Sequence, residues 1–418
     1  MRERLNNALL AVLLALMLLL TGATMFLSMR SSRVGGQIDA AEPDGESGRL
    51  RLSAAQTAVY PEQLAVFCEG GVWLPLQKTD YELLYQQIEP FYLEALGSAG
   101  PLTRMEETEY LRRMEPPAVL VQYHAPQPLS LLRIWSGGAG TDGDVAVCRT
   151  VITLERENVI ALFTDETGAR WRAETVASAE ELRGICGAER EINAVLAGPE
   201  QASLAADEVL TDRSFSAETL FAAPTEFAQK GELPQSVLTA LGMNAYLSKV
   251  YPDADGNLVY VEGRSTVRVG REGDLHYTGE ADLALVERAG AEMEAEVCRK
   301  ISDLLEQLWS LTGAGGTLSL EELRREDDGA LALRFGLEEG GRFLERREGL
   351  WAAAVVRDGA LTDLMASPRV LEPGESLLLM PLSKMSAALP EGRARLCVRL
   401  LEGESGAFAP AVCRVTED

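Results

Sequence analysis

A glycine-rich stretch is the first feature of this sequence whose residue types and spacing could do chemistry. Residues 138–143 (Gly-Ala-Gly-Thr-Asp-Gly) match the G-x-G-x-x-G spacing of dinucleotide sites. In such a site the glycine loop leads from a strand into a helix, whose N-terminal amides bind the pyrophosphate. Apolar runs at residues 129–135 and 145–154 instead predict a strand on each side of the loop. We therefore predict a hairpin loop here and no nucleotide site.

A second pattern imitates a calcium-binding loop. Asp253, Asp255 and Asn257 have the spacing of the first ligands of such a loop. Gly256 comes two positions too early, however, and Arg264 occupies the position of the final glutamate ligand. Asp, Asn and Gly also suit the backbone of a tight turn between two strands. We predict a hairpin turn at these residues.

Histidine and cysteine, the commonest catalytic and metal-binding side chains, are scarce. His124 and His276 have no His or Cys at ligand spacing, so we expect surface or edge positions rather than zinc binding. Cys397 and Cys413 lie on consecutive β-like runs and form the one pair to test for a disulfide, but free buried thiols are the expected state. The sequence has no Cys-x-x-Cys, His-Glu-x-x-His or Ser-x-x-Lys motif. We predict a protein that is not an enzyme, with no catalytic residues, no cofactor and no metal.

The net charge excludes one large class of partners. The chain has 418 residues, 39 basic and 64 acidic, which gives a net charge of −25. A surface this acidic repels phosphate backbones, so nucleic-acid binding is excluded. Apolar residues make up 46% of the chain, as in globular proteins, and the length suggests two or three domains.

The N-terminus predicts a membrane anchor. Residues 8–27 carry no charge and include nine leucines, and as a helix they would be about 30 Å long, the thickness of a bilayer core. A cleaved signal peptide is the alternative, but the apolar run continues past the small residues at which cleavage would fall. We predict a cytoplasmic tail (1–7), a single-pass anchor in the cell membrane (8–29), a flexible linker (30–50) and an extracytoplasmic body, because long domains are exported largely regardless of charge.

Small residues follow one face of the predicted anchor. Ala8, Ala11, Ala15 and Gly22 lie close to this face, where they would let a second helix approach closely in the bilayer. Alanine and glycine are also common in any spanning helix, so a partner-helix contact is one of two interpretations.

The body predicts an α+β fold in which helices pack on antiparallel sheets. Strand-like runs lie at residues 63–68, 118–123, 129–135, 145–154, 159–163 and 169–174. Helix signals are a run from Thr79 towards Pro90 and two capping boxes, Thr103 with Glu106 and Ser178 with Glu181. We predict an N-terminal α+β domain (51–200), a middle α+β module (201–279) and a C-terminal α+β module (280–418).

The second half contains an internal similarity. Residues 236–263 align with residues 309–336 without gaps, with eight identities in 28 positions. Both copies read as a helix end followed by hairpins, so the last two modules are either duplicated or alike by chance. Between them, an amphipathic pattern over residues 280–311 predicts the strongest helix of the chain, with its apolar stripe on the C-terminal sheet or, alternatively, on a partner helix.

Three segments carry a resemblance to a known family. Residues 258–269 (Leu-Val-Tyr-Val-Glu-Gly-Arg-Ser-Thr-Val-Arg-Val), the turn at 273–277 and the strand-turn at 353–359 resemble the YycH family, as does the arrangement of one N-terminal span before a large exported body. That family consists of accessory proteins which, with their relative YycI, regulate a membrane sensor histidine kinase of a two-component system for cell-wall metabolism. The resemblance implies contacts with the kinase in the membrane and with a YycI-like partner outside it. An anchored cell-envelope ligand-binding module and a cell-wall hydrolase are the alternatives.

Overall fold

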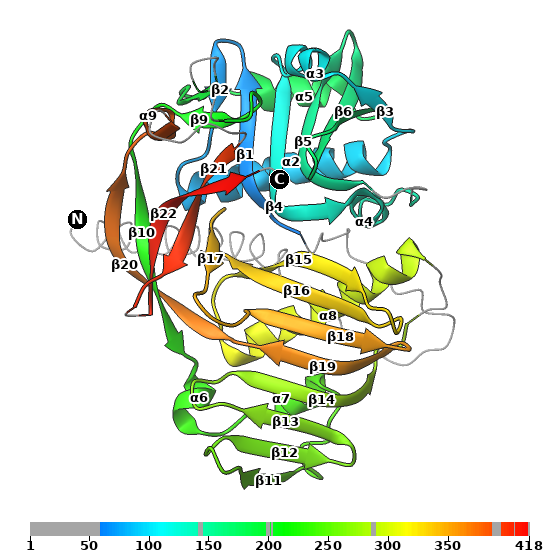
Figure 1. Cartoon of the computed structure of the whole chain (residues 1–418), viewed down its shortest axis with the longest axis vertical. Helices are drawn as coiled ribbons and strands as arrows, with labels where there is room; N and C mark the ends of the chain where they lie inside the picture. The colour runs from blue at the N-terminus through cyan, green and yellow to red at the C-terminus, as the bar shows by residue number, and fades with distance from the viewer. Residues whose placement is uncertain are drawn as a thin grey trace, which may run out of the picture. The chain divides into compact units, whose positions relative to one another are not determined.

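The computed structural model describes residues 59–140, 145–197, 201, 204–285, 290–386, 394–404 and 406–416. In this part of the chain two large, mainly antiparallel sheets are packed with helices, which confirms the predicted α+β class (Figure 1). None of the helices described is both long and apolar enough to cross a membrane. The predicted tail, anchor and linker, with Ala8, Ala11, Ala15 and Gly22, lie outside the described residues.

The first sheet has nine strands in the order β3-β7-β6-β5-β4-β1-β2-β8-β9 among the residues described. Their bounds are β1 (Pro61–Cys68), β2 (Gly71–Trp73), β3 (Thr103–Met105), β4 (Ala118–Pro128), β5 (Ala146–Glu155), β6 (Asn158–Asp165), β7 (Arg170–Glu174), β8 (Ala194–Leu196) and β9 (Val209–Thr211). Its helices are α2 (Lys78–Gly97), α3 (Glu107–Arg113), α4 (Leu129–Trp135) and α5 (Ala179–Gly187).

Both faces of the first sheet are buried, which explains why its strands are continuously apolar. On β1, Leu64 and Val66 pack into the core that contains α2 and α5, whereas Ala65 and Phe67 pack into a second core on the opposite face, with Tyr110 of α3. Alternate side chains of a strand point to opposite faces, so a strand covered on both sides needs apolar residues throughout.

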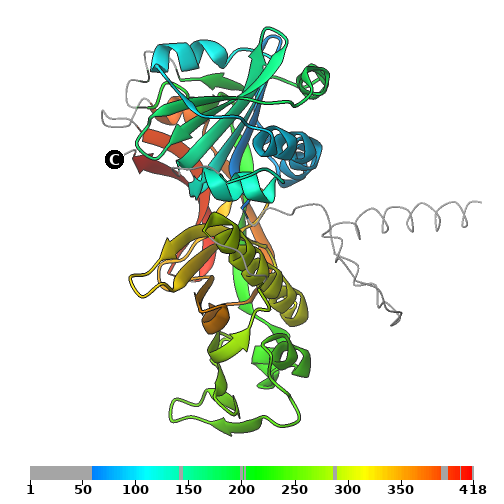
Figure 2. The same cartoon turned by 90° about the vertical axis from the view of Figure 1, so that its right-hand side faces the viewer.

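The second sheet has thirteen described strands, in the order β11-β12-β13-β14-β19-β18-β16-β17-β21-β22-β10-β20, with β15 paired to β16. Its strands are β10 (Phe215–Pro224), β11 (Lys249–Pro252), β12 (Leu258–Glu262), β13 (Ser265–Val269), β14 (Leu275–Asp282), β15 (Thr317–Arg325), β16 (Leu331–Glu338), β17 (Phe343–Glu345), β18 (Ala352–Arg357), β19 (Ala360–Ala366), β20 (Arg369–Leu379), β21 (Ala394–Glu402) and β22 (Ala407–Thr416). Its helices are α6 (Glu226–Lys230), α7 (Gln235–Ala240), α8 (Ala291–Thr312) and α9 (Leu382–Met385). Figure 2 shows the long α8 across one face of this sheet.

The two similar sequence segments form the same order of elements. In the first, α7 precedes the hairpins β11–β12 and β13–β14; in the second, α8 precedes the hairpins β15–β16 and β18–β19, with β17 inserted between them. The last strands, β14 and β19, pair with each other antiparallel, so the two four-stranded groups meet edge to edge. Leu275 lies opposite Ala366 in this pairing.

One predicted strand is a helix. Residues 129–135 form α4, in which Leu129, Leu132 and Trp135 follow the spacing of a buried helical face. The Trp135 indole N–H donates to the Ala295 carbonyl of α8 at 3.3 Å, so tertiary packing of this segment between helices outweighs its strand-like composition. The glycine loop therefore follows a helix and precedes β5, which still lacks the strand-to-helix context of a dinucleotide site.

Three helix boundaries also differ from the predictions. The Thr103 capping box is wrong: Thr103 lies in β3, and α3 begins at Glu107 after Glu106. Helix α2 does not end at Pro90 but continues to Gly97, because the buried apolar positions continue beyond the proline. The predicted helix from residue 280 begins only at Ala291, and residues 280–282 instead complete β14.

The predicted helix start at Ser178 is confirmed, with Ser178 as its N-cap, and it provides a test of local stability. The Ser178 hydroxyl accepts a hydrogen bond from the Glu181 backbone N–H at 3.3 Å, at the start of α5. Ser178→Ala should lower the free energy of unfolding by about 1 kcal/mol, because it removes the partner of that amide. Thr103→Ala is the control: Thr103 has the same sequence motif but makes no cap, so urea unfolding should show almost no change. Equal losses in both variants would contradict the assignment.

Candidate functional site

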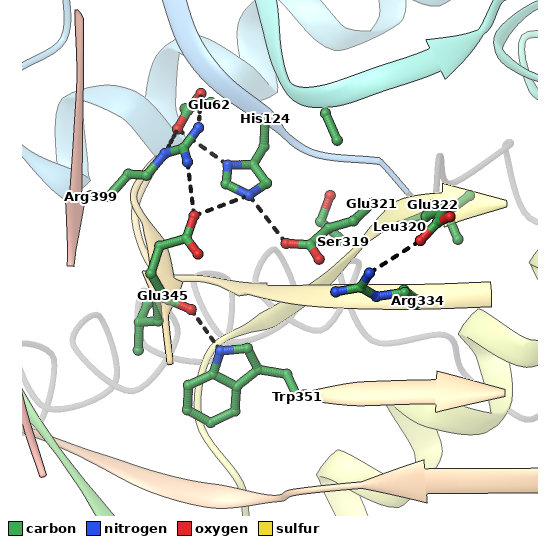
Figure 3. Close-up of polar contacts among 12 residues, drawn as sticks. Glu62, His124, Ser319, Leu320, Glu321, Glu322, Arg334, Glu345, Trp351 and Arg399 are labelled. Atoms are coloured by element: carbon green, nitrogen blue, oxygen red, sulfur yellow. Dashed lines mark hydrogen bonds and ion pairs between the residues drawn. The ribbon is translucent and has the colours of Figure 1, made fainter. Parts of the chain in front are cut away.

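Five charged side chains from both sheets meet at one point, which we call the junction cluster: Glu62, His124, Glu321, Glu345 and Arg399. Glu62 and His124 come from β1 and β4 of the first sheet, and the other three come from β15, β17 and β21 of the second (Figure 3). The side chain of Glu62 is 3% exposed and that of His124 is 11% exposed. The cluster is therefore an ionic contact between the two sheets with a buried centre, whereas the side chains of Glu321 and Glu345 are 24% and 38% exposed.

His124 is held on both ring nitrogens. Its Nδ1 lies 3.3 Å from Glu62 Oε1, and its Nε2 lies 3.2 Å from Glu321 Oε1 and 3.5 Å from Glu345 Oε1. The ring stacks on Phe343 of β17, with centroids 4.0 Å apart and 7° between the planes. Burial alone would lower the pKa of His124, but hydrogen bonds to Glu321 and Glu62 outweigh it and raise the pKa to about 9. The imidazole is therefore positively charged at neutral pH.

Arg399 completes the cluster from β21. Its Nε lies 2.7 Å from Glu62 Oε1, and its Nη1 lies 2.8 Å from Glu345 Oε1. Burial would raise the pKa of Glu62, but the hydrogen bond and charge of His124, together with Arg399, lower it to about 2. Glu62 is thus ionised at any physiological pH and bridges the two cations.

The geometry of the junction cluster favours a structural role over catalysis. A general base needs a ring nitrogen within reach of a substrate proton, whereas both nitrogens of His124 face carboxylates. The nearby Ser319 hydroxyl accepts a hydrogen bond from the Tyr60 backbone N–H at 2.9 Å. A pocket of about 460 Å³ adjoins the cluster and is lined by His124, Arg395 and Arg399 among others. Its Arg399 is already paired with Glu62 and Glu345, so both cations of the cluster have carboxylate partners within the protein.

A second, fully buried group joins the same parts of the fold; we call it the Arg149 cluster, after the β5 residue at its centre. Arg149 Nη1 lies 3.0 Å from Asp207 Oδ2, and Nη2 lies 2.7 Å from Glu208 Oε2, with all three side chains 0% exposed. The other carboxylate oxygen of Glu208 accepts from the Leu396 backbone N–H of β21 at 3.1 Å. Burial raises the pKa of Glu208, and the charge of Arg149 opposes this effect.

Strand β21 connects the two clusters. Arg395, Cys397 and Arg399 alternate along the strand and so share one of its faces. The positive charge of Arg395 favours the ionised forms of Asp207 and Glu208, whereas Arg399 belongs to the junction cluster. One strand of the second sheet therefore contributes a cation to each ionic contact with the first.

The turn between β16 and β17 makes a further contact with the first sheet's helices. Arg342 Nη2 donates to the Leu76 carbonyl at 2.7 Å, just before α2, and Lys78 pairs with Glu339. Glu338 is buried here, and burial raises its pKa to about 8 although the Gly341 backbone N–H donates to it. These contacts place another titratable carboxyl between the halves.

The residues singled out from the sequence have simpler surroundings. Asp253 accepts from the backbone N–H groups of Asp255 and Asn257, which confirms a hairpin turn between β11 and β12. His276 is partly exposed and lies 2.8 Å from Asp363, in agreement with its predicted surface position. The surface position predicted for His124 is wrong, because sequence spacing could not reveal partners on distant strands. Among the residues described, no group of His, Cys, Asp and Glu could hold a metal ion.

Comparison with known proteins places the fold. No family model and no curated protein matches the chain. The crystal structure of YycH from Bacillus subtilis matches with a TM-score of 0.55 and 8% sequence identity, over 87% of this chain and 95% of that one. The chain has a YycH-like fold. At this identity the likeness concerns the fold alone, and it extends over nearly the whole length of both chains.

Proposed function

We propose that this protein is a membrane-anchored, extracytoplasmic accessory protein of the YycH kind. It modulates a sensor histidine kinase of a cell-envelope two-component system through protein contacts and has no reaction of its own. The likeness to YycH over 87% of the chain is the observation that carries this proposal. A YycI-like protein is the proposed partner of the body, and the kinase helices are the proposed partners of residues 8–27 in the cell membrane.

The ion pairs between the two sheets support a mechanism in which partner binding acts on the whole body. His124, Glu62 and Arg399 hold the two sheets together by ion pairs that are largely shielded from water, where such pairs are little weakened by salt. A body joined in this way responds to a partner as one unit. We propose that partner binding to the body shifts the position or rotation of the anchor against the kinase helices.

The test is crosslinking of the full-length protein to the kinase in membranes. Ala11→Leu with Ala15→Leu should lower the crosslinked fraction about tenfold, because larger side chains on the small-residue face keep the helices apart and about 1.4 kcal/mol of association energy is a factor of ten. The kinase itself is identified first, by mass spectrometry of proteins that co-purify with the full-length chain.

Thr24→Leu is the matched control, since it makes a similar change on the opposite face of a helix with about 100° per residue. It should leave crosslinking unchanged. If the double variant crosslinks as well as the parent protein, the proposed contact through Ala11 and Ala15 is wrong. If no kinase co-purifies with the parent protein, the proposed function is wrong as a whole.

A further inference from the structure

Two of the six cysteines lie directly opposite each other in the second sheet. Cys397 of β21 and Cys413 of β22 are antiparallel partners, in a register that continues unbroken from Ala394–Thr416 to Glu402–Phe408. Directly opposite residues in antiparallel strands have Cα atoms about 4.5 or 5.5 Å apart, and a disulfide needs about 4.4–6.8 Å. Both cysteines are free thiols in the structure. The backbone therefore already has the spacing of a cross-strand disulfide.

We propose that Cys397 and Cys413 form a disulfide that crosslinks β21 to β22. This modification site is independent of the proposed partner kinase. It depends on the register of two strands and on access to one of the two sulfurs.

The two thiols differ in the way that disulfide exchange requires. Cys413 is half-buried, whereas Cys397 is buried. The hydrogen bond from Cys397 lowers the pKa of the Cys413 thiol to about 7, with burial opposing it and the charge of Arg399 assisting. The same hydrogen bond, together with burial, raises the pKa of the Cys397 thiol. Because Cys413 is the more accessible sulfur, it is the attacking thiol, and Cys397 is the resolving thiol.

The chemistry balances with a small-molecule disulfide as the oxidant. The Cys413 thiolate attacks one sulfur of oxidised glutathione, forming a mixed disulfide and releasing one glutathione thiolate. Cys397 loses its proton and attacks the Cys413 sulfur, which forms the protein disulfide and releases the second glutathione thiolate. The protein loses two hydrogen atoms, and the oxidant gains them as two thiols.

The crosslink would lie between the two ionic clusters. Cys397 is two residues from both Arg395 and Arg399 and shares their face of β21. The negative charge of Glu62, in the junction cluster, opposes the ionisation of both thiols. Oxidation would thus fix the strand that contributes a cation to each contact between the sheets.

The experiment treats the full-length protein in detergent micelles with oxidised glutathione at pH 8, then blocks free thiols with N-ethylmaleimide for peptide mapping by mass spectrometry. The parent protein should lose two reactive thiols and yield a linked pair of peptides containing Cys397 and Cys413. Cys397→Ser should instead accumulate a glutathione adduct on Cys413, because the resolving thiol is missing. Cys413→Ser should give neither product.

Cys298→Ser is the matched control, because Cys298 is a buried thiol of α8 far from this pair in sequence. It should give the same linked peptides as the parent protein. The proposal is overturned if N-ethylmaleimide still alkylates both Cys397 and Cys413 of the parent protein after the glutathione treatment. It is also overturned if the linked peptides join other cysteines. Both of these outcomes are measured on the parent protein, so they decide the question even if a serine variant fails to fold.

Discussion

Arg149→Met is expected to lower the free energy of unfolding by about 3–5 kcal/mol, the cost of leaving a buried charge without its partner. Arg149 is the ion-pair partner of Glu208 and, together with Arg170, of Asp207, and all these side chains are buried. Methionine has a similar size, so the loss reflects the two carboxylates rather than a cavity. Urea unfolding followed by circular dichroism measures the change.

A matched surface pair separates burial from charge. Arg183 and Glu157 are also 2.7 Å apart, but their side chains are 47% and 79% exposed. Arg183→Met should therefore cost at most about 1 kcal/mol. Adding Glu208→Gln to Arg149→Met should recover part of the loss, since the amide keeps an acceptor for the Leu396 N–H and removes one buried charge. Equal losses at Arg149 and Arg183 would contradict the role given to the buried cluster.

His124→Gln is expected to flatten the pH dependence of stability between pH 6.5 and 9. The pKa of His124 is raised from 6.5 to about 9 in the folded protein, so the stabilisation is complete below pH 6.5 and is lost as the pH rises to about 9. The difference between these pKa values corresponds to about 3 kcal/mol of stabilisation. This figure is the combined effect on His124 of all the charged groups around it. Urea unfolding at pH 6, 7.5 and 9.5 should show a large loss in the variant at pH 6 and little at pH 9.5.

His276→Gln provides the control, because His276 is the only other histidine and is partly exposed beside Asp363. Because an exposed ion pair contributes little to stability, this variant should lose at most about 1 kcal/mol. Burial raises the pKa of Glu338 to about 8, so its contribution to the stability of the fold also falls as the pH rises from 4.5 through 8. The comparison is therefore made between variants rather than within one curve. If both histidine variants flatten the profile equally, the junction cluster is not its source.

The fold class could be predicted because local patterns determine it. Continuous apolar runs gave most strands of the first sheet, and the Ser178 box gave the start of α5. Where prediction failed, as at α4, the segment had apolar residues suitable for both a strand and a helix. The choice depends on packing against α2 and α8, which are distant in sequence.

The junction cluster could not be predicted for the same reason. Glu62 and Arg399 are 337 residues apart, and neither lies in a recognisable motif. In a chain with 64 acidic residues, no local feature distinguishes Glu62, Glu321 and Glu345 from the others. The one available signal was the scarcity of histidine, which made His124 worth examining but suggested the wrong environment.

The position of the last two strands determines when the second sheet can form. β21 pairs with β17, and β22 lies between β21 and β10, so residues 394–416 connect the rest of the sheet to β10 and β20. A chain still emerging from the ribosome lacks these strands and cannot close the sheet, because these pairings join segments far apart in sequence. The connection of β10 and β20 to the rest of the sheet therefore forms only after residues 394–416 have been synthesised, so this part of the sheet is expected to form late.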